Sequence, residues 1–170
     1  MKTGKSNLEK DIFLKAYERE FNTTLRVLNA YPEGKLDLKG DNLRSAGEIA
    51  FRLIGEQAVA DMAMKGKIEF NGEPPVPNSK ADIITPLKAM FQNNLEKIKN
   101  LTDEEYNSLV TFPEGPDNGK VLRKADVFWL TLYDMVHHRG QLSVYLRLAG
   151  GKVPSIYGPS ADETENVFLV

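Results

Sequence analysis

The chain has 170 residues and no cysteine, with a formal net charge of −2, 41% hydrophobic residues and 27% charged residues. This length and composition are typical of one soluble globular domain, so we expect a single domain over residues 1–170. The lack of cysteine in this sequence excludes disulfides, thiolate metal sites and a cysteine nucleophile. The slightly negative charge argues against nucleic acid as a partner, because phosphate binding needs a concentrated basic face.

No window of the sequence approaches the roughly 20 apolar residues that a membrane helix requires. The first ten residues are polar and lack the apolar stretch of a signal peptide. We therefore expect a cytoplasmic protein that makes no membrane contact.

Helical periodicity defines the first two elements. Apolar side chains recur at three- and four-residue steps over residues 7–30, which predicts the first helix. The second helix is predicted to begin near Leu43, with Asp41 or Asn42 as its N-cap, and to end at Gly66. The segment that follows is rich in proline and is expected to be a loop over the end of the helices.

The third helix is predicted to begin after the N-cap residue Ser79 and to continue to about Leu101. Pro86 falls inside this pattern, so it either lies in the first turn of a later-starting helix or kinks the helix. A short helical turn is expected at residues 103–109, and an irregular loop at residues 113–119.

The fourth helix, predicted over residues 121–148, is the most apolar, and Gly150 and Gly151 end it. The tail over residues 153–170 contains two prolines and is not expected to be helical before its very end. No alternation of apolar and polar residues is long enough to build a sheet. The sequence therefore predicts an all-α protein, in which the long loops around the third helix leave crossover connections open.

The candidate chemistry lies in the middle of the fourth helix. Asp134 and His138 are four residues apart and share a helix face, so together they can bind one metal ion. His137 is rotated about a quarter turn away from them. The structural alternative for Asp134 and His138 is a hydrogen bond or ion pair without a metal, because two ligands are too few for a tetrahedral site.

Two stretches resemble one known family. HHRGQLSVYLRLAGGKVPSIYGPSADE (137–163) resembles the C-terminal signature of the DinB/YfiT-like superfamily, and LRVLNAYPEGKLDLKGDNLRSAGEIAFRLI (25–54) resembles its helix 1–helix 2 region. The resemblance implies a four-helix bundle in an up-down-down-up arrangement and a homodimer. It also implies a divalent metal, often zinc or nickel, held by three histidines. Characterised relatives include metal-dependent transferases and isomerases that use low-molecular-weight thiols.

Carried over residue by residue, the histidine set is incomplete. His138 matches the last histidine, but Asp134 stands where the preceding one is expected, and Arg52 occupies the expected third ligand position. A guanidinium has no lone pair for a metal, whereas it can form a bidentate ion pair with a carboxylate. We therefore predict that Arg52 and Asp134 pair across the place of the metal.

The leading interpretation is a DinB-like protein with a modified or lost metal site and no cofactor, acting as a small-molecule-binding or scaffold protein. The alternative is a metal-dependent, thiol-using transferase or isomerase, in which Asp134 and His138 hold zinc or nickel with a further carboxylate or water. Glu48 and Glu56, one turn before and after Arg52, are candidates for that carboxylate. Tyr157 either points its hydroxyl into the pocket or packs the tail onto the bundle. The apolar surface of the fourth helix supports the homodimer.

Overall fold

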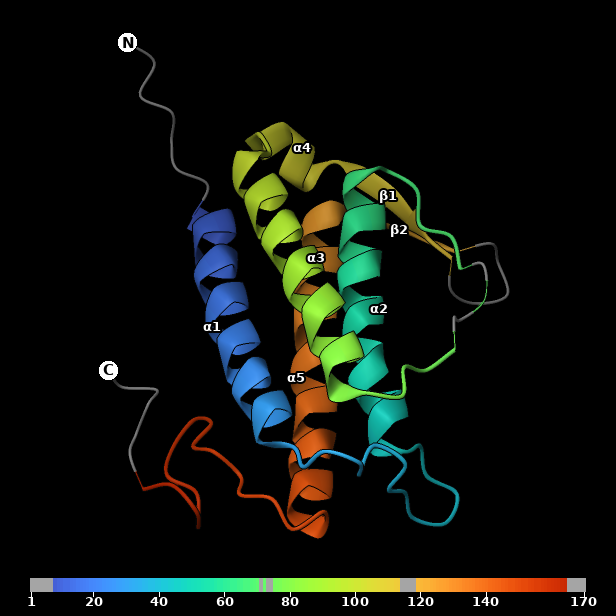
Figure 1. The fold of residues 1–170 in the computed structure, drawn as a ribbon. Coiled ribbons are helices and arrows are strands. Elements are labelled where there is room, and N and C mark those ends of the chain that lie inside the picture. The colour runs from blue at the N-terminus through green and yellow to red at the C-terminus, as the bar shows by residue number, and fades with distance from the viewer. Residues whose placement is uncertain (1–7, 71, 73–74, 114–118, 165–170) are drawn as a thin grey trace.

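The computed structural model describes residues 8–70, 72, 75–113 and 119–164 of the chain. Four long helices, one short helix and a small hairpin make up this part (Figure 1). In chain order the elements are α1 (Leu8–Ala30), α2 (Ala46–Met64), α3 (Lys80–Asn100), α4 (Asp103–Asn107), β1 (Leu109–Phe112), β2 (Lys120–Arg123) and α5 (Lys124–Leu148). The four predicted long helices are confirmed, and α4 confirms the predicted turn after the third.

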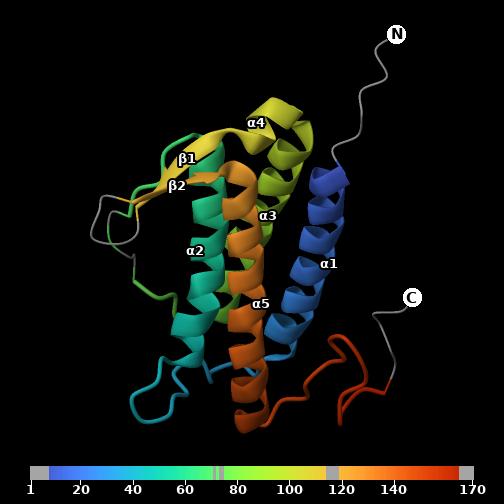
Figure 2. The same ribbon diagram turned by 180° about the vertical axis from the view of Figure 1, so that it is seen from behind.

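The long helices form a bundle in which α1 and α2 both pack against α3 and α5. Helices α1 and α5 run in one direction, and α2 and α3 run in the other (Figures 1 and 2). This is the expected up-down-down-up arrangement. Because α2 and α3 are parallel, the chain between them has to return along the length of the bundle. None of the helices in the described residues is long and apolar enough to cross a membrane.

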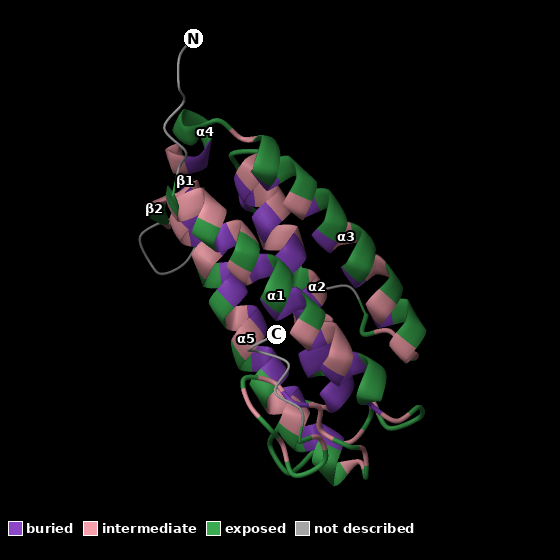
Figure 3. Ribbon diagram, turned by 90° about the vertical axis from the view of Figure 1, so that its left-hand side faces the viewer, coloured by how far each residue is buried: buried purple, intermediate pink, exposed green. Residues whose placement is uncertain are grey.

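Aromatic side chains fill the centre of the bundle. Buried residues lie along the inward faces of the helices and exposed residues on their outer faces (Figure 3). Phe13, Tyr17 and Phe21 follow one another at four-residue steps on α1 and are at most 2% exposed. Phe21 stacks on Phe91 of α3 with 3.6 Å between ring centroids, and Phe13 lies 5.9 Å from Phe128 of α5. The periodicity of the sequence therefore corresponds to the core-facing sides of the helices.

Helix α2 begins three residues later than predicted. Its N-cap is Ser45, whose hydroxyl accepts a hydrogen bond from the Glu48 backbone N–H at 3.2 Å. The Glu48 carboxylate in turn accepts from the Ser45 backbone N–H at 2.6 Å, which completes a capping box. Asn42 has a φ of 59°, in the left-handed region, so the backbone is still turning where the helix was expected to start. The prediction of Asp41 or Asn42 as N-cap was wrong.

Replacing Ser45 with alanine is expected to lower the free energy of unfolding by about 1 kcal/mol, since the first turn of α2 loses its side-chain acceptor. For a domain of this size that corresponds to a fall in Tm of about 2–4 °C, which thermal unfolding followed by circular dichroism measures. Thr23→Ala removes a hydroxyl from within α1 that donates only to the Arg19 carbonyl. This control is expected to leave the Tm unchanged or slightly raised, and an equal loss in both variants would refute the capping role.

The structure contains a hairpin that the sequence did not predict. Strands β1 and β2 pair antiparallel, with Val110 opposite Leu122 and Thr111 opposite Val121. As a result α5 begins at Lys124 and not at residue 121. β-Branched side chains favour strands, but four residues per strand are too few for an alternating pattern to be recognised. The hairpin lies beside the ends of α2 and α5 (Figure 2).

The remaining helix predictions have mixed outcomes. Ser79 is the N-cap of α3, as expected, and its hydroxyl accepts from the Asp82 N–H at 3.1 Å. Pro86 lies inside α3 beyond its first turn, and the helix continues on both sides of it. The tail from residue 151 to 164 is not helical. Residue 7, most of the predicted loop (114–118) and the end of the tail (165–170) lie outside the described residues.

Candidate metal centre

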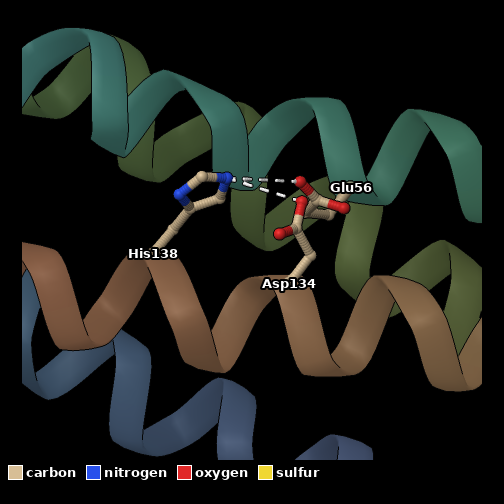
Figure 4. A group of neighbouring side chains, drawn as sticks. All are labelled: Glu56, Asp134 and His138. Carbon is tan, nitrogen blue, oxygen red and sulfur yellow. Dashed lines mark ion pairs between the residues drawn. The ribbon is translucent and has the colours of Figure 1, made fainter. Parts of the chain in front are cut away.

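Three ligand-type side chains from two helices meet at one point. Glu56 comes from α2, and Asp134 and His138 come from α5 (Figure 4). His138 Nε2 lies 3.4 Å from Asp134 Oδ2 and 3.9 Å from Glu56 Oε1. One ligand atom from each residue lies within 4.8 Å of the others. The group is therefore compact enough for all three residues to reach one ion.

Local contacts on α5 orient His138. Its Nδ1 lies 3.1 Å from Gln141 Oε1, which can only accept, so Nδ1 donates and Nε2 faces the carboxylates. Gln141 Nε2 lies 3.0 Å from His137 Nε2, so one glutamine holds both histidine rings. A second hydrogen bond of this kind fixes the tautomer and direction of a ligating imidazole. The glutamine of the HHRGQ motif therefore positions the histidine.

Contacts inside the bundle hold the turn of α2 that carries Glu56. The next residue, Gln57, is buried in the bundle and is 1% exposed. Its side-chain oxygen accepts from the Tyr17 hydroxyl, and Asn94 Nδ2 donates to the Gln57 backbone carbonyl at 2.8 Å. These bonds join α2 to α1 and α3 at the level of the three side chains. The position of Glu56 is thus fixed by the core and not by a surface loop.

The three side chains differ in exposure. Glu56 and His138 keep 11% and 8% of their side-chain surface exposed, whereas Asp134 keeps 44%. Burial raises the pKa of Glu56 to about 9, and a hydrogen bond with Asp134 and the charge of Asp134 act in the same direction. The positive charge of Arg52 opposes this rise. Without a cation the Glu56 carboxyl is therefore neutral at pH 7 and shares its proton with the carboxylate of Asp134.

The residues fit a divalent cation in both spacing and charge. Two ligand atoms about 2.1 Å from a tetrahedral ion are separated by about 3.4 Å. The measured 3.4 and 3.9 Å from His138 Nε2 are close to this value, so small side-chain rotations suffice. Two ionised carboxylates and a neutral imidazole balance the charge of a divalent ion. Such oxygen and nitrogen donors suit zinc, nickel, manganese and iron.

The raised pKa of Glu56 predicts a pH-dependent stability for the metal-free protein. The folded state keeps a proton on Glu56 up to about pH 9, whereas the unfolded chain loses it near pH 4.5. The stabilisation is therefore complete below the unfolded value and is lost as the pH rises toward 9, at up to about 1.4 kcal/mol per pH unit. Urea unfolding in chelator at pH 5, 7 and 9 measures this loss.

Glu56→Gln is the matched control for this pH dependence, since an amide stays neutral throughout the range. We expect the free energy of unfolding of this variant to fall less between pH 5 and 9 than that of the parent protein. Parallel pH profiles for the two proteins would show that Glu56 titrates normally in the folded state.

The residues predicted from the sequence occupy different places. Asp134 and His138 lie together, as their spacing implies. Arg52, one turn before Glu56 on α2, lines the same cavity as Glu56 and Asp134. Its ion pair with Asp134 stays a prediction. Of the two carboxylates considered as alternatives, Glu56 joins the group, whereas Glu48 belongs to the capping box at the start of α2.

Tyr157 takes part in a separate polar cluster between the tail, α1 and α5. Its hydroxyl accepts a hydrogen bond from Arg139 Nη2 and donates to Glu20 Oε2 at 2.8 Å. Arg139 Nη1 also lies 2.7 Å from Glu20 Oε2, and its guanidinium lies 5.1 Å from the centre of the Tyr157 ring. Of the two roles considered for Tyr157, these contacts support packing of the tail onto the bundle. The sequence did not indicate this cluster, because Glu20 and Arg139 are 119 positions apart in the chain.

A cavity of about 590 Å³ opens beside Glu56 and Asp134. Its walls come from α2, α5, β1 and the segment that follows α2. Arg52, Thr131, Glu56 and Asp134 contribute polar groups, and most of the remaining lining is apolar. This volume lies within the range of small-molecule sites in proteins. The sequence did not reveal the cavity, because its walls come from four separate segments.

Comparisons with known proteins agree with this fold. The model of the DinB family matches residues 5–166. The uncharacterised protein YrdA of Bacillus subtilis is 26% identical over 160 residues, which is 90% of each chain. The crystal structure of a DinB-like protein from Bacillus cereus has a TM-score of 0.73 at 23% identity and covers 85% of this chain and 95% of that one.

YfiT from Bacillus subtilis has a TM-score of 0.70 at 12% identity, over 88% of this chain and 93% of that chain. It is described as a probable metal-dependent hydrolase with an unusual four-helix bundle topology. At this identity the likeness concerns the fold, and both structures confirm the bundle that the sequence predicted.

Proposed function

Because the chain belongs to the DinB family and brings Glu56, Asp134 and His138 together, we propose that it is a metal-dependent enzyme acting on a small molecule. The three residues hold a divalent transition metal, and the adjacent cavity holds the substrate. The observation that carries the proposal is the approach of three ligand atoms to within 4.8 Å of one another. The description of YfiT as a probable metal-dependent hydrolase supports the same class of chemistry.

A divalent ion at this place would supply a Lewis acid that polarises a substrate and lowers the pKa of a bound nucleophile. Water is one such nucleophile, and because the chain has no cysteine, a thiol nucleophile would have to be brought in as a second substrate. The description of YfiT as a probable metal-dependent hydrolase favours water as the nucleophile, and therefore hydrolysis. Ester cleavage that proceeds without added thiol supports hydrolysis, whereas an absolute need for a low-molecular-weight thiol supports the transferase alternative.

Elemental analysis of the untagged protein by plasma mass spectrometry tests the metal site. We expect about one equivalent of zinc, nickel, manganese or iron as purified, or after chelation and reloading. Failure to bind any of these ions after incubation with an excess would refute the proposal.

A second candidate is a ligand-binding protein that has lost its metal. Arg52, in the expected third ligand position, supports it, because a fixed positive charge near Glu56 opposes a cation. This candidate predicts no bound metal, an Arg52–Asp134 ion pair and thermal stabilisation by an anionic ligand. The elemental analysis described above separates the two candidates.

We also infer a homodimer that forms through α5. Tyr133, Val144 and Leu148 are 63%, 61% and 70% exposed, and their spacing of eleven and four residues places them on one side of the helix. Exposed apolar side chains gathered on one face are typical of an interface.

Sedimentation equilibrium at micromolar concentration is expected to give a dimer for the parent protein and a monomer for Val144→Glu, because the interface then buries an unpaired charge. Leu43, 61% exposed in the loop before α2, provides the control. Leu43→Glu is expected to remain dimeric. A monomeric parent protein, or equal behaviour of both variants, would contradict an interface on α5.

A further inference from the structure

The cavity beside the candidate metal centre has a polar end and an apolar end. Arg52, Glu56 and Asp134 form the polar end. From there the cavity follows α2 as far as Met62, a rise of about 15 Å at 1.5 Å per residue. Apolar side chains from α2, α5, β1 and the segment after α2 line this part: Val59, Met62, Phe70, Phe112 and Leu130. Phe51 and Ile54 also line the cavity, at the level of Arg52.

Two of these apolar side chains keep a large part of their surface exposed to water. Phe70 is 58% exposed and Leu130 is 44% exposed. Phe70 meets Phe112 edge to face, with 6.1 Å between ring centroids, so the two rings form a continuous wall. An apolar group in the cavity would remove these surfaces from water, which is favourable in proportion to the area buried.

Gly55 forms the open part of the wall on α2, directly before Glu56. A Cβ atom at this position would meet nothing within 4 Å, so neighbouring groups do not require a glycine here. A glycine inside a helix is less favourable than an alanine, because it leaves the unfolded chain with more freedom. Gly55 lines the cavity, so its missing side chain leaves space there beside Glu56.

The charges around the cavity favour an anion at its polar end. Arg52 brings a guanidinium to the lining of this end, and a guanidinium can donate two hydrogen bonds to one carboxylate or phosphate. A divalent ion held by Glu56, Asp134 and His138 would place a second positive group beside it. Glu69, the other acidic residue in the lining, pairs with Lys67 at 2.7 Å. The apolar end therefore carries no net charge, and the two ends together match an amphipathic anion.

We propose that the cavity binds a small amphipathic anion as the substrate of the metal centre. The anionic group lies between Arg52 and the metal, and a medium-length alkyl chain or an aryl group lies over Gly55 against Met62 and Phe112. This assignment rests on the proposed metal-dependent function for its polar end. The apolar end depends only on the cavity walls, so the two parts can be tested separately.

Isothermal titration calorimetry with straight-chain carboxylates from butyrate to decanoate tests the apolar end. We expect the affinity of the full chain to rise about fourfold for each added methylene until the cavity is filled. Gly55→Leu should abolish this rise, because a Cβ atom at this position meets nothing within 4 Å and the rest of the side chain takes up space in the cavity that Gly55 lines. The zinc content of the Gly55→Leu variant should equal that of the parent protein.

Gly140→Leu is the matched control. Gly140 also lies inside a long helix where an added Cβ atom would meet nothing within 4 Å, but it does not line the cavity. This variant gains the same helix propensity and is expected to keep the chain-length dependence. Arg52→Gln is expected to weaken octanoate binding about tenfold or more and to leave octanol binding unchanged, since only the carboxylate meets the guanidinium.

Each outcome concerns a defined part of the proposal. If the protein binds no zinc but the chain-length dependence persists and Gly55→Leu removes it, the apolar site stands and the metal-dependent function fails. Affinities that do not change with chain length overturn the substrate class, whether or not zinc binds. The substrate class is also overturned if Gly55→Leu changes the oligomeric state in sedimentation but not the binding of carboxylates. In that case a second copy of the chain, and not a small molecule, would cover the cavity.

Discussion

Glu56→Gln is expected to lower the affinity of the protein for zinc by roughly 100-fold or more, because a charged ligand is replaced by a neutral amide of the same size. Loss of an outer-shell contact already costs about 10–100-fold, so loss of a direct ligand should cost at least as much. His138→Ala and Asp134→Asn are expected to act in the same direction. Competition with a chromogenic chelator at pH 7.5 measures the affinity, and circular dichroism verifies the fold.

Two other glutamates serve as matched controls for Glu56. Glu69 lines the same cavity but is exposed and paired with Lys67, and Glu48 caps the start of α2. Glu69→Gln and Glu48→Gln remove one negative charge each and are expected to keep the zinc affinity within about threefold, since screened charges at a distance contribute little. A Glu56→Gln protein with the affinity of the parent would remove Glu56 from the ligand set.

The positioning role of Gln141 predicts a smaller loss. Gln141→Leu leaves all three ligands in place but removes the acceptor for His138 Nδ1–H. We expect the zinc affinity to fall about 10–100-fold, as is usual when the second contact of a ligating histidine is removed. An effect as large as that of His138→Ala would indicate that the histidine ring no longer reaches the site at all.

Arg139→Met is expected to lower the free energy of unfolding by about 3–5 kcal/mol, which is the largest stability effect of the substitutions considered. Arg139 is 1% exposed and its Nη1 lies 2.7 Å from Glu20 Oε2, where the side chain of Glu20 is 6% exposed. Burial raises the pKa of Glu20, but hydrogen bonds from Tyr157 and Arg139 and the charge of Arg139 lower it by more. Glu20 is therefore ionised, and methionine would leave its charge buried and without the guanidinium.

Arg19→Met is the control, because Arg19 contacts the same carboxylate at 3.2 Å from a half-exposed position. Exposed pairs of this kind contribute at most about 1 kcal/mol. The double substitution Glu20→Leu with Arg139→Met should recover much of the loss, since replacing both partners of a buried pair with apolar groups is often neutral. Urea unfolding of the four proteins measures these differences, and equal losses for Arg19→Met and Arg139→Met would contradict the buried pair.

Polar contacts with α1 and α5, including those of the Tyr157 cluster, explain the position of the tail. Arg139 donates to Tyr157, Arg26 Nη2 lies 2.6 Å from Glu163 Oε2, and Arg147 Nη2 lies 2.8 Å from Asp162 Oδ2. These contacts hold residues 155–163 against α1 and α5, on a different set of residues from those that line the cavity. The C-terminal motif of the sequence therefore serves the packing of the tail as well as the site that contains His138.

The sequence by itself determined the helices, the bundle arrangement and one half of the site. Long helices are recognisable because their core faces repeat every 3.6 residues over five or more turns. Asp134 and His138 are neighbours because four residues on one helix are a single turn, which is a local property of the chain. The motif in α5 and the region around α2 were enough to indicate the family and, through it, the fold.

Only the tertiary structure showed that Glu56 of α2 lies beside Asp134 and His138. Glu56 is one helical turn, about 5.4 Å, from Arg52, and nothing local to α2 fixes which level of the helix lies opposite the ligands on α5. That level is set by packing across the bundle, where Gln57 bonds to Tyr17 and Asn94. The hairpin, the cavity and the contact between Glu20 and Arg139 depend in the same way on segments distant in the chain, whose approach is decided by the fold as a whole.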